Sequence, residues 1–215
     1  MKTQAASELA KAGPKPSAWR ENVEAIVIAV VLALLIRTFG VQAFKIPSGS
    51  MLETLQIGDH ILVNKLSYGL KMPFFGEPLV GGKNPRHGDI VVFAYPEDPR
   101  KDFIKRVVGV AGDRLEIRDK QLYRNGKPVP HEPYAVFKDP VFYRKELSPR
   151  DNMGPITVPE GMLFTMGDNR DHSSDSRYWG YVDVRSVKGK AFMIYWSWDQ
   201  DRFRPRWGRL GNFLS

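Results

Sequence analysis

The sequence has no cysteine among its 215 residues. A chain without thiols has no disulfide framework, no thiol nucleophile and no cysteine-ligated zinc or iron–sulfur site. It also lacks the Gly-x-Ser-x-Gly elbow of the α/β-hydrolases and the Ser-x-x-Lys motif of penicillin-recognising enzymes, so neither class is indicated. The mean hydropathy of -0.35 excludes a protein that crosses a membrane many times.

The remaining composition fits one domain, with or without a small insertion. Hydrophobic residues make up 42% of the chain and charged residues 26%, which is enough apolar surface for a packed core. The formal net charge is +8 at pH 7. A charge of this sign suits an anionic partner, either nucleic acid or a phospholipid surface.

One stretch departs from the pattern of a soluble domain. Residues 25–36 are twelve uncharged apolar residues in a row, and the segment reaches twenty residues when it is extended to Phe44. A helix of twenty residues spans about 30 Å, the thickness of the hydrocarbon core of a bilayer. Basic residues precede the segment, while Lys45 alone is basic in the twenty residues that follow it. This bias predicts a cytoplasmic N-terminus. We expect an anchor that is not removed.

The anchor divides the chain into three predicted parts. They are a cytoplasmic tail at 1–22, a transmembrane signal-anchor at 23–44 and an extracytoplasmic domain at 45–215. Two other interpretations stay open for the apolar run: a buried core helix, or a removed secretory signal cleaved near Ala43, where Val-Gln-Ala resembles a cleavage site.

The outer region has the pattern of a mainly β fold. Short β-branched runs such as 60–66, 89–95 and 103–110 are separated by turn residues, and none is long enough for a stable helix. Residues 127–160 are rich in proline and charge, and we expect a smaller inserted β subdomain at about 115–158. Four Gly-Asp pairs match no metal-loop spacing and are ordinary turn chemistry, so we predict neither a metal nor a cofactor.

The first candidate site is the serine-containing loop at 46–51. Pro47 and Gly49 favour extended or turn geometry, which exposes backbone N–H groups beside small hydroxyl side chains. Such a loop suits a nucleophile that a peptide backbone must approach closely, although most serine-rich loops are only connections.

The second candidate is Lys105, in the strand-like run 103–110. Because a strand alternates its faces, Lys105 shares a side with Phe103 and Val107. A free lysine needs about 4.6 kcal/mol to lose its proton at pH 7, and burial among apolar side chains supplies several pKa units of that cost. A neutral amine then acts as general base toward a serine hydroxyl. The alternative is a charged edge-strand lysine that prevents aggregation.

The third candidate is the polar loop at 166–180, whose opposite charges suit buried ion pairs that orient a site, or simply a solvated turn. His60 and His172 each follow an aspartate, which leaves a Ser-His-Asp triad open as a further possibility.

Together these segments resemble the bacterial type I signal peptidases, or leader peptidases. The resemblance lies in four boxes in family order, Pro47–Met51, His87–Phe93, Lys105–Asp113 and Gly167–Arg177. It covers about residues 22–210. One departure is Glu53, which stands where the family usually has proline and puts the rigidity of the loop after the serine in doubt.

The resemblance implies a signal-peptidase-like β catalytic domain with a Ser-Lys dyad. In it Ser50 is the nucleophile and Lys105 the general base, and Ser48 with the Ser50 backbone N–H forms the oxyanion hole. Ser173 would hydrogen-bond the Lys105 amine, and a pair between Asp175 and Arg177 would support Ser173.

The implied substrates are exported preproteins with small residues at the -1 and -3 positions. An extended substrate would pair with the segment before Ser50 and with 102–104. The implied walls of the substrate pocket are apolar: Phe44, Ile46, Met51, Leu55, Ile61, Val92 and Ile104.

The expected surroundings are the bacterial cytoplasmic membrane, with the phospholipid bilayer as a partner and no nucleic acid, since no nucleic-acid motif accompanies the positive charge. Two rival functions stay open. A Ser-Lys self-cleaving repressor would need a soluble N-terminal DNA-binding domain, whereas residues 1–45 of this chain contain the apolar segment. A lipid-facing β scaffold would keep Lys105 charged and structural.

Overall fold

The computed structural model describes residues 18–71, 78–80, 82–130 and 132–214. The chain separates into two compact units, Met1–Thr38 and Phe39–Ser215. Residues 1–17 of the predicted cytoplasmic tail lie outside the described residues.

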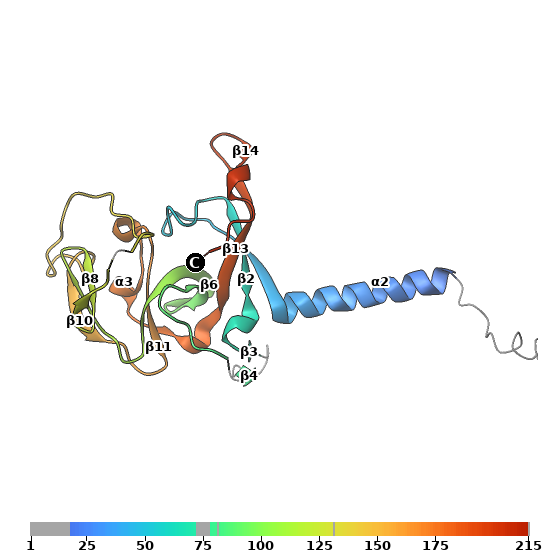
Figure 1. Ribbon diagram of the computed structural model, residues 1–215, viewed down its shortest axis with the longest axis horizontal. Coiled ribbons are helices and arrows are strands. Elements are labelled where there is room, and N and C mark those ends of the chain that lie inside the picture. Colours follow the sequence, from blue (N-terminus) through green and yellow to red (C-terminus); the bar gives the residue numbers. More distant parts are fainter. Residues whose placement is uncertain (1–17, 72–77, 81, 131, 215) are drawn as a thin grey trace, which may run out of the picture. The chain divides into compact units, whose positions relative to one another are not determined.

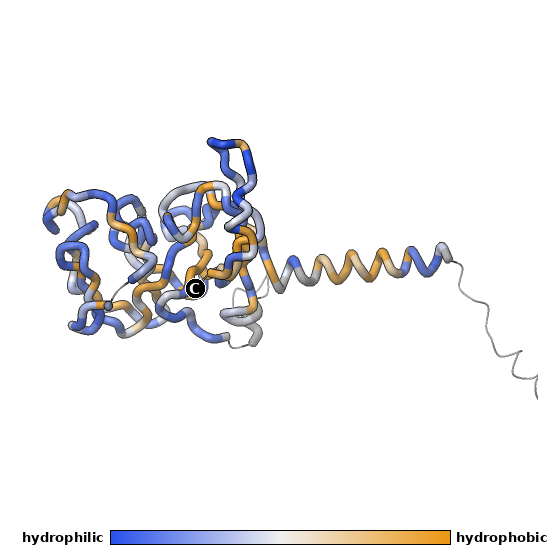
Figure 2. The backbone as a smooth tube through the Cα atoms, turned by 45° about the horizontal axis from the view of Figure 1, so that its top comes forward, coloured by the Kyte–Doolittle hydropathy of each residue, from blue (hydrophilic) through white to orange (hydrophobic). Residues whose placement is uncertain are grey.

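The first unit contains helix α2 (Ala18–Leu35), which continues into a short π-helix, η2 (Ile36–Gly40). The alanines and leucines of this run and the lack of glycine and proline favour the helix, although its valines and isoleucines are weaker helix formers. Figure 2 shows polar residues at the start of the helix followed by an apolar stretch. No helix within the described ranges is both apolar enough and long enough to cross a bilayer.

The sequence predicted a transmembrane segment at 23–44, but the helical structure ends at Gly40. Its last residues belong to strand β1 (Val41–Lys45), which pairs antiparallel with β2 (Asp59–Asn64), so that Phe44 lies opposite Ile61. The pairing satisfies backbone groups that a continuing helix would have used, and it places these residues in the second unit.

The second unit is mainly β, as the sequence predicted. Its main antiparallel sheet has the strand order β1-β2-β13-β5-β6-β11-β12, with β14 paired to β13 (Figure 1). The bounds of the strands not yet given are β5 (Ile90–Tyr95), β6 (Asp98–Val110), β11 (Met162–Met166), β12 (Val182–Asp183), β13 (Val187–Asp199) and β14 (Arg204–Pro205). The two longest, β6 and β13, lie within the main sheet, and register shifts interrupt several of their pairings. Such irregularities bend strands, which lets long ones follow a curved sheet.

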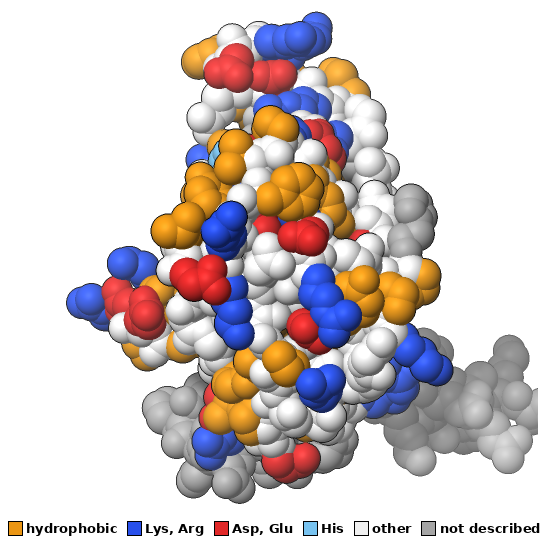
Figure 3. Space-filling model, turned by 90° about the vertical axis from the view of Figure 1, so that its left-hand side faces the viewer, with side chains coloured by type: hydrophobic (Ala, Val, Ile, Leu, Met, Phe, Trp, Pro, Cys, Tyr) orange, Lys and Arg blue, Asp and Glu red, His pale blue; other side chains and the backbone are white. Residues whose placement is uncertain are grey.

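A second antiparallel sheet has the order β10-β7-β8-β9. Its strands are β7 (Arg114–Arg118), β8 (Gln121–Arg124), β9 (Lys127–Pro128) and β10 (Met153–Thr157). Asn125 and Gly126 form the turn between β8 and β9, with φ of 54° and 80°, the positive values that tight hairpin turns require. These strands lie in the range for which an inserted subdomain was predicted, and the division into domains stays a prediction. Figure 3 views this end of the unit and shows groups of apolar side chains among charged ones.

The two sheets pack closely at the C-terminal end of β6. A Cβ on Gly109 would lie 2.5 Å from the Leu115 side chain, so glycine permits this contact. Val108 of β6 and Phe164 of β11 share one buried cluster with Leu115 and Leu122 of the second sheet. This cluster holds the C-terminal end of β6 in place, and β6 is the strand that carries Lys105.

Short elements complete the unit. They are β3 (Leu70–Lys71) with β4 (Pro78–Val80), the 3₁₀ helices η3 (Lys65–Tyr68), η4 (Arg170–His172), η5 (Val184–Ser186) and η6 (Trp207–Arg209), and the one-turn helix α3 (Ser176–Trp179).

Alternation along β5 separates two further apolar clusters. Ile90 and Val92 belong to one cluster, and Val91 and Phe93 to the other. Successive side chains of a strand point to opposite faces, so β5 has a core on both sides. The first of these clusters includes Met51 and lies beneath the loop that carries the candidate serine.

Candidate active site

Ser50 lies in the connection between β1 and β2. The ends of this connection are joined by backbone hydrogen bonds from Ile46 N to Asp59 O, 2.8 Å, and from Gly58 N to Ile46 O, 3.0 Å. Its middle is a helical turn in which Leu55 N donates to Met51 O, and both side chains are fully buried. The serine is therefore presented by a turn whose apolar side chains anchor it to the core.

Lys105 reaches the same place from β6, where it pairs with Val91 of β5. Its Nζ donates to Ser50 Oγ at 2.8 Å and to the carbonyl of Ile104 at 3.0 Å. The residue is 4% exposed, and its amine lies 5.3 Å from the centre of the Phe103 ring. The predicted shared face of Lys105 and Phe103 is thus present, and so is a hydroxyl within reach of the amine.

Burial lowers the pKa of the Lys105 ammonium group. Loss of solvent lowers the pKa of Lys105 from 10.5 to about 8, although the negative charges of Asp175 and Asp168 act in the opposite direction. At pH 7 about a tenth of such amines are neutral, whereas an ordinary lysine is almost entirely charged. The site can therefore supply a proton acceptor to Ser50.

The polar loop after β11 completes the site. Arg177 binds both carboxylate oxygens of Asp175, through Nε at 2.8 Å and Nη2 at 2.9 Å. Burial raises the pKa of Asp175, but the charge and hydrogen bonds of Arg177 outweigh it and hold that pKa below its usual range. The same carboxylate accepts a bond from the Gly167 N–H at 3.0 Å, so the pair fixes the start of the loop.

Ser173 is buried in this loop, but the predicted hydrogen bond to Lys105 is not formed. Within the described part of the chain, no hydrogen bond joins Ser173 Oγ to Lys105; the Ser173 hydroxyl interacts instead with the carboxylate of Asp175 and helps to lower its pKa. The amine of Lys105 is directed instead at Ser50 and at the carbonyl of Ile104, which neighbours it in sequence.

Gly167 permits the close approach of the polar loop and the loop that carries Ser50. A Cβ at this position would lie 2.2 Å from Ser173 Oγ and 2.4 Å from the carbonyl oxygen of Ser50. Since side chains cannot come so close, only glycine fits here without displacing the loop or the nucleophile.

A buried ion pair joins β6 to the loop after β11 and stabilises this arrangement. Arg106, next to Lys105, binds Asp168 through Nε and Nη2, both at 2.9 Å, and both residues are almost completely buried. Thr54, from the turn after Ser50, donates its hydroxyl to the same carboxylate at 2.6 Å. Arg106 and Asp168 lie inside two of the four boxes, next to residues with implied roles, but the sequence interpretation gave no role to them or to Thr54.

The residue that replaces the usual proline, Glu53, makes an exposed ion pair with Lys138 at 2.9 Å. Pairs at such exposed sites contribute about 0–1 kcal/mol, so this contact adds little to the rigidity of the turn.

A cleft of about 540 Å³ opens over the serine and the lysine. Its lining includes Ser48, Ser50, Ile104, Lys105, Asn169 and His172. Ser48 is exposed at this cleft. His172 is also exposed there, but the hydrogen bond to the Ser50 hydroxyl comes from Lys105, so the geometry does not favour a histidine triad.

The seven predicted pocket residues do come together, but mostly as core. All belong to one apolar cluster or pack against it: Phe44, Ile46, Met51, Leu55, Ile61, Val92 and Ile104. Five of them are at most 2% exposed, which leaves Phe44 and Ile104 as partly exposed members. Of the seven, Ile104 lines the cleft over the serine, and the role of the other six as pocket walls stays a prediction.

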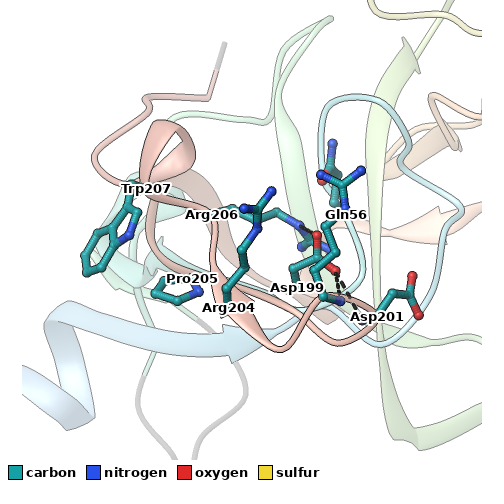
Figure 4. A pocket seen from close by; sticks show the side chains of 8 residues that line it. Gln56, Asp199, Asp201, Arg204, Pro205, Arg206 and Trp207 are labelled. Atoms are coloured by element: carbon teal, nitrogen blue, oxygen red, sulfur yellow. Dashed lines mark hydrogen bonds and ion pairs between the residues drawn. The ribbon is translucent and has the colours of Figure 1, made fainter.

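A larger hollow of about 720 Å³ lies at the β13–β14 hairpin, with Asp199, Arg204, Arg206 and Trp207 around it (Figure 4). Its lining contains neither Ser50 nor Lys105. Across the described residues, no three acidic or histidine side chains gather in a way that could hold a metal ion.

Comparison with known proteins shows the family of this chain. A family model described as signal peptidase, peptidase S26 matches residues 19–196. The chain is 39% identical to signal peptidase I of Pseudomonas fluorescens, over 84% of this chain and 74% of that protein. It is 37% identical to the probable signal peptidase I-1 of Synechocystis sp., over 93% and 92% respectively. A crystal structure of a signal peptidase I from Enterococcus faecalis is 35% identical and covers 50% of this chain and 97% of that one, with a TM-score of 0.42.

The chain belongs to the signal peptidase family, peptidase S26. It is a hydrolase of the signal peptidase class, which removes signal peptides. The resemblance inferred from the four boxes is confirmed by these sequence matches.

The burial of the amine predicts that Lys105→Met stabilises the protein at pH 7. The unfolded lysine holds its proton up to pH 10.5, whereas the folded one releases it near 8. Below pH 8 this difference costs folding about 3 kcal/mol, and the cost disappears as the pH rises from 8 to 10.5. After allowance for two lost hydrogen bonds, we expect a gain of about 1–3 kcal/mol at pH 7 and a smaller one at pH 10.

Urea unfolding of both proteins at the two pH values measures this gain. Lys101→Met, on the same strand but exposed, is the matched control and should change stability little. A loss of stability in Lys105→Met at pH 7 contradicts the interpretation of the amine as a buried, costly group.

Proposed function

We propose that this protein is a membrane-bound serine endopeptidase that cleaves signal peptides from exported preproteins with a Ser50-Lys105 dyad. The observation that carries the proposal is the 2.8 Å contact between the Lys105 amine and the Ser50 hydroxyl, in a site where burial lowers the pKa of that amine.

The proposed reaction begins with neutral Lys105. As the Ser50 oxygen attacks the scissile carbonyl carbon, its proton passes to Nζ, and a tetrahedral intermediate forms. The resulting ammonium gives the proton to the leaving amine, the peptide bond breaks, and the N-terminal fragment remains as an ester on Ser50. A water molecule, deprotonated by Lys105, then hydrolyses the ester and restores the serine.

The negative oxygen of the intermediate needs hydrogen-bond donors. The Ser50 backbone N–H and the Ser48 hydroxyl are proposed for this task, on the basis of the resemblance and of their place at the cleft. A single donor of this kind typically lowers the barrier by about 2.7–4 kcal/mol.

We further propose that the enzyme prefers small residues at the -1 and -3 positions of the substrate. An extended substrate would lie along the residues before Ser50 and along 102–104 of β6, in the manner of an added strand. Ile104, which lines the cleft and is half-buried, supports an apolar contact that accepts a methyl group and disfavours charge.

Substitution of the dyad tests the proposal directly. Ser50→Ala, Lys105→Ala and Lys105→Arg should each reduce cleavage of an Ala-x-Ala preprotein by at least about 10⁴-fold, because each removes the nucleophile or a base that can be neutral. Cleavage is measured with purified protein in detergent and followed by electrophoresis.

Ser67→Ala, in η3, is the matched serine control and should retain activity. A preprotein with a bulky residue at -1 should resist the parent enzyme. If Ser50→Ala or Lys105→Ala still cuts, the dyad is wrong, and the structural-scaffold alternative regains support.

The pH profile provides an independent test. Because the base must be neutral, kcat/KM should rise about tenfold per pH unit below the Lys105 pKa of about 8 and level off above it. The profile is measured from pH 5 to 10 under conditions in which the protein stays folded. A flat profile contradicts a titrating base in the free enzyme.

We propose that the apolar segment of the first unit anchors the protein in the cytoplasmic membrane, with the catalytic unit on the outer face. The support is the run at 25–36, the basic residues before it and the exposed apolar side chains of α2, such as Ile26 and Leu34. The full chain should then stay with membranes during alkaline carbonate extraction.

A variant with lysine at Val30 and Leu34 should be released by the same treatment, because a charge near the bilayer centre costs about 2.5–3.5 kcal/mol. Release of the parent chain contradicts the anchor. Protease digestion of intact cells reports which side of the membrane carries the catalytic unit.

A further inference from the structure

Asn169 holds the backbone of the nucleophile from the loop after β11. Its side-chain Nδ2 donates to the carbonyl of Gly49 at 3.0 Å, and its backbone N–H donates to the carbonyl of Ser50 at 3.2 Å. One residue, only 5% exposed, thus binds two consecutive carbonyl groups at the serine.

The first of these bonds acts on the proposed oxyanion hole. The Gly49 carbonyl and the Ser50 N–H are the two ends of one peptide group, and that group is planar. A donor that fixes the carbonyl therefore also fixes the direction of the N–H. A hydrogen bond to the carbonyl also polarises the peptide and strengthens its N–H as a donor.

The N–H at the other end of this peptide is available to a substrate. Among the residues that the structure describes, none accepts a hydrogen bond from Ser50 N–H. The side-chain amide and this peptide both lie at the cleft that contains the dyad.

The Asn169 side chain is not optimised for stability. Its Oδ1 is buried and has no hydrogen-bond partner among the described residues, which is an uncompensated desolvation cost.

We infer that Asn169 is a positioning residue for the oxyanion hole: through the Gly49 carbonyl it orients and polarises the peptide whose N–H receives the negative oxygen. This inference rests on the proposed function, because it takes Ser50 as the nucleophile and its N–H as a donor to the intermediate.

The test substitution is Asn169→Asp. It keeps the size of the side chain and the backbone bond to Ser50, but it places an oxygen that cannot donate opposite the Gly49 carbonyl. We expect kcat to fall about 10- to 100-fold, somewhat less than the 10²–10³-fold that removal of an oxyanion donor typically costs, with KM within about twofold.

Asn152→Asp is the matched control. Asn152 also donates Nδ2 to a backbone carbonyl, that of Tyr143 at 3.0 Å, and it lies outside the cleft. Its kcat should be that of the parent. Asn169→Ala, which introduces no charge, replaces Asn169→Asp if thermal unfolding shows that the aspartate variant is not folded.

A substrate with a thiocarbonyl in place of the scissile carbonyl separates positioning from general damage. Sulfur accepts hydrogen bonds more weakly than oxygen, so the parent enzyme should cleave the oxygen substrate much faster. In Asn169→Asp the oxygen-to-sulfur rate ratio should fall toward one, because the donor is already misplaced. A purely structural role would slow both substrates equally and leave the ratio unchanged.

An unchanged ratio therefore overturns the inference. So does a rise in KM at constant kcat, which would mean that Asn169 contacts the substrate itself. Ser50→Ala is measured alongside: if it retains cleavage, the proposed dyad has failed, whereas an inactive Ser50→Ala with an unchanged ratio in Asn169→Asp overturns only the positioning role.

Discussion

The candidate active site depends on one contact, between the buried amine of Lys105 and the hydroxyl of Ser50. Lys105 is almost free of solvent and 2.8 Å from Ser50, and this burial lowers its pKa to about 8. Two buried carboxylates nearby, Asp168 and Asp175, would restore the positive charge if they were unpaired. Each is bound in bidentate fashion by an arginine, which limits its effect on the amine.

The same ion pairs also explain how three distant segments stay in register. Arg106 adjoins Lys105 on β6, Asp168 follows Gly167 after β11, and Thr54 lies in the turn that carries Ser50. Their shared hydrogen bonds connect nucleophile, base and supporting loop within a few residues of the reacting atoms. A buried pair of this kind contributes little net stability, because desolvation offsets attraction. Its value here is geometric, since general-base catalysis needs a short and aligned contact.

Much of this could be predicted from the sequence. Alternating β-branched runs and Gly-Asp turns predicted a mainly β fold, and the spacing of Lys105 within its strand predicted that it shares a face with Phe103. The four ordered boxes predicted the family and brought Ser50 and Lys105 forward as candidates. The end of the apolar segment was predicted less well, because hydropathy does not show that Val41–Lys45 pairs with β2 as an edge strand.

What the sequence determined by itself is the chemistry available: a serine, a lysine, paired charges, and glycine where two segments must meet. Tertiary structure alone decided which of these touch, because contacts such as Asn169 with Gly49 join residues 120 positions apart. It also decided that most of the predicted pocket residues are core and that Ser173 does not bond to the amine. Burial and hydrogen-bond direction depend on the packing of many segments at once, and no local pattern of residues contains that information.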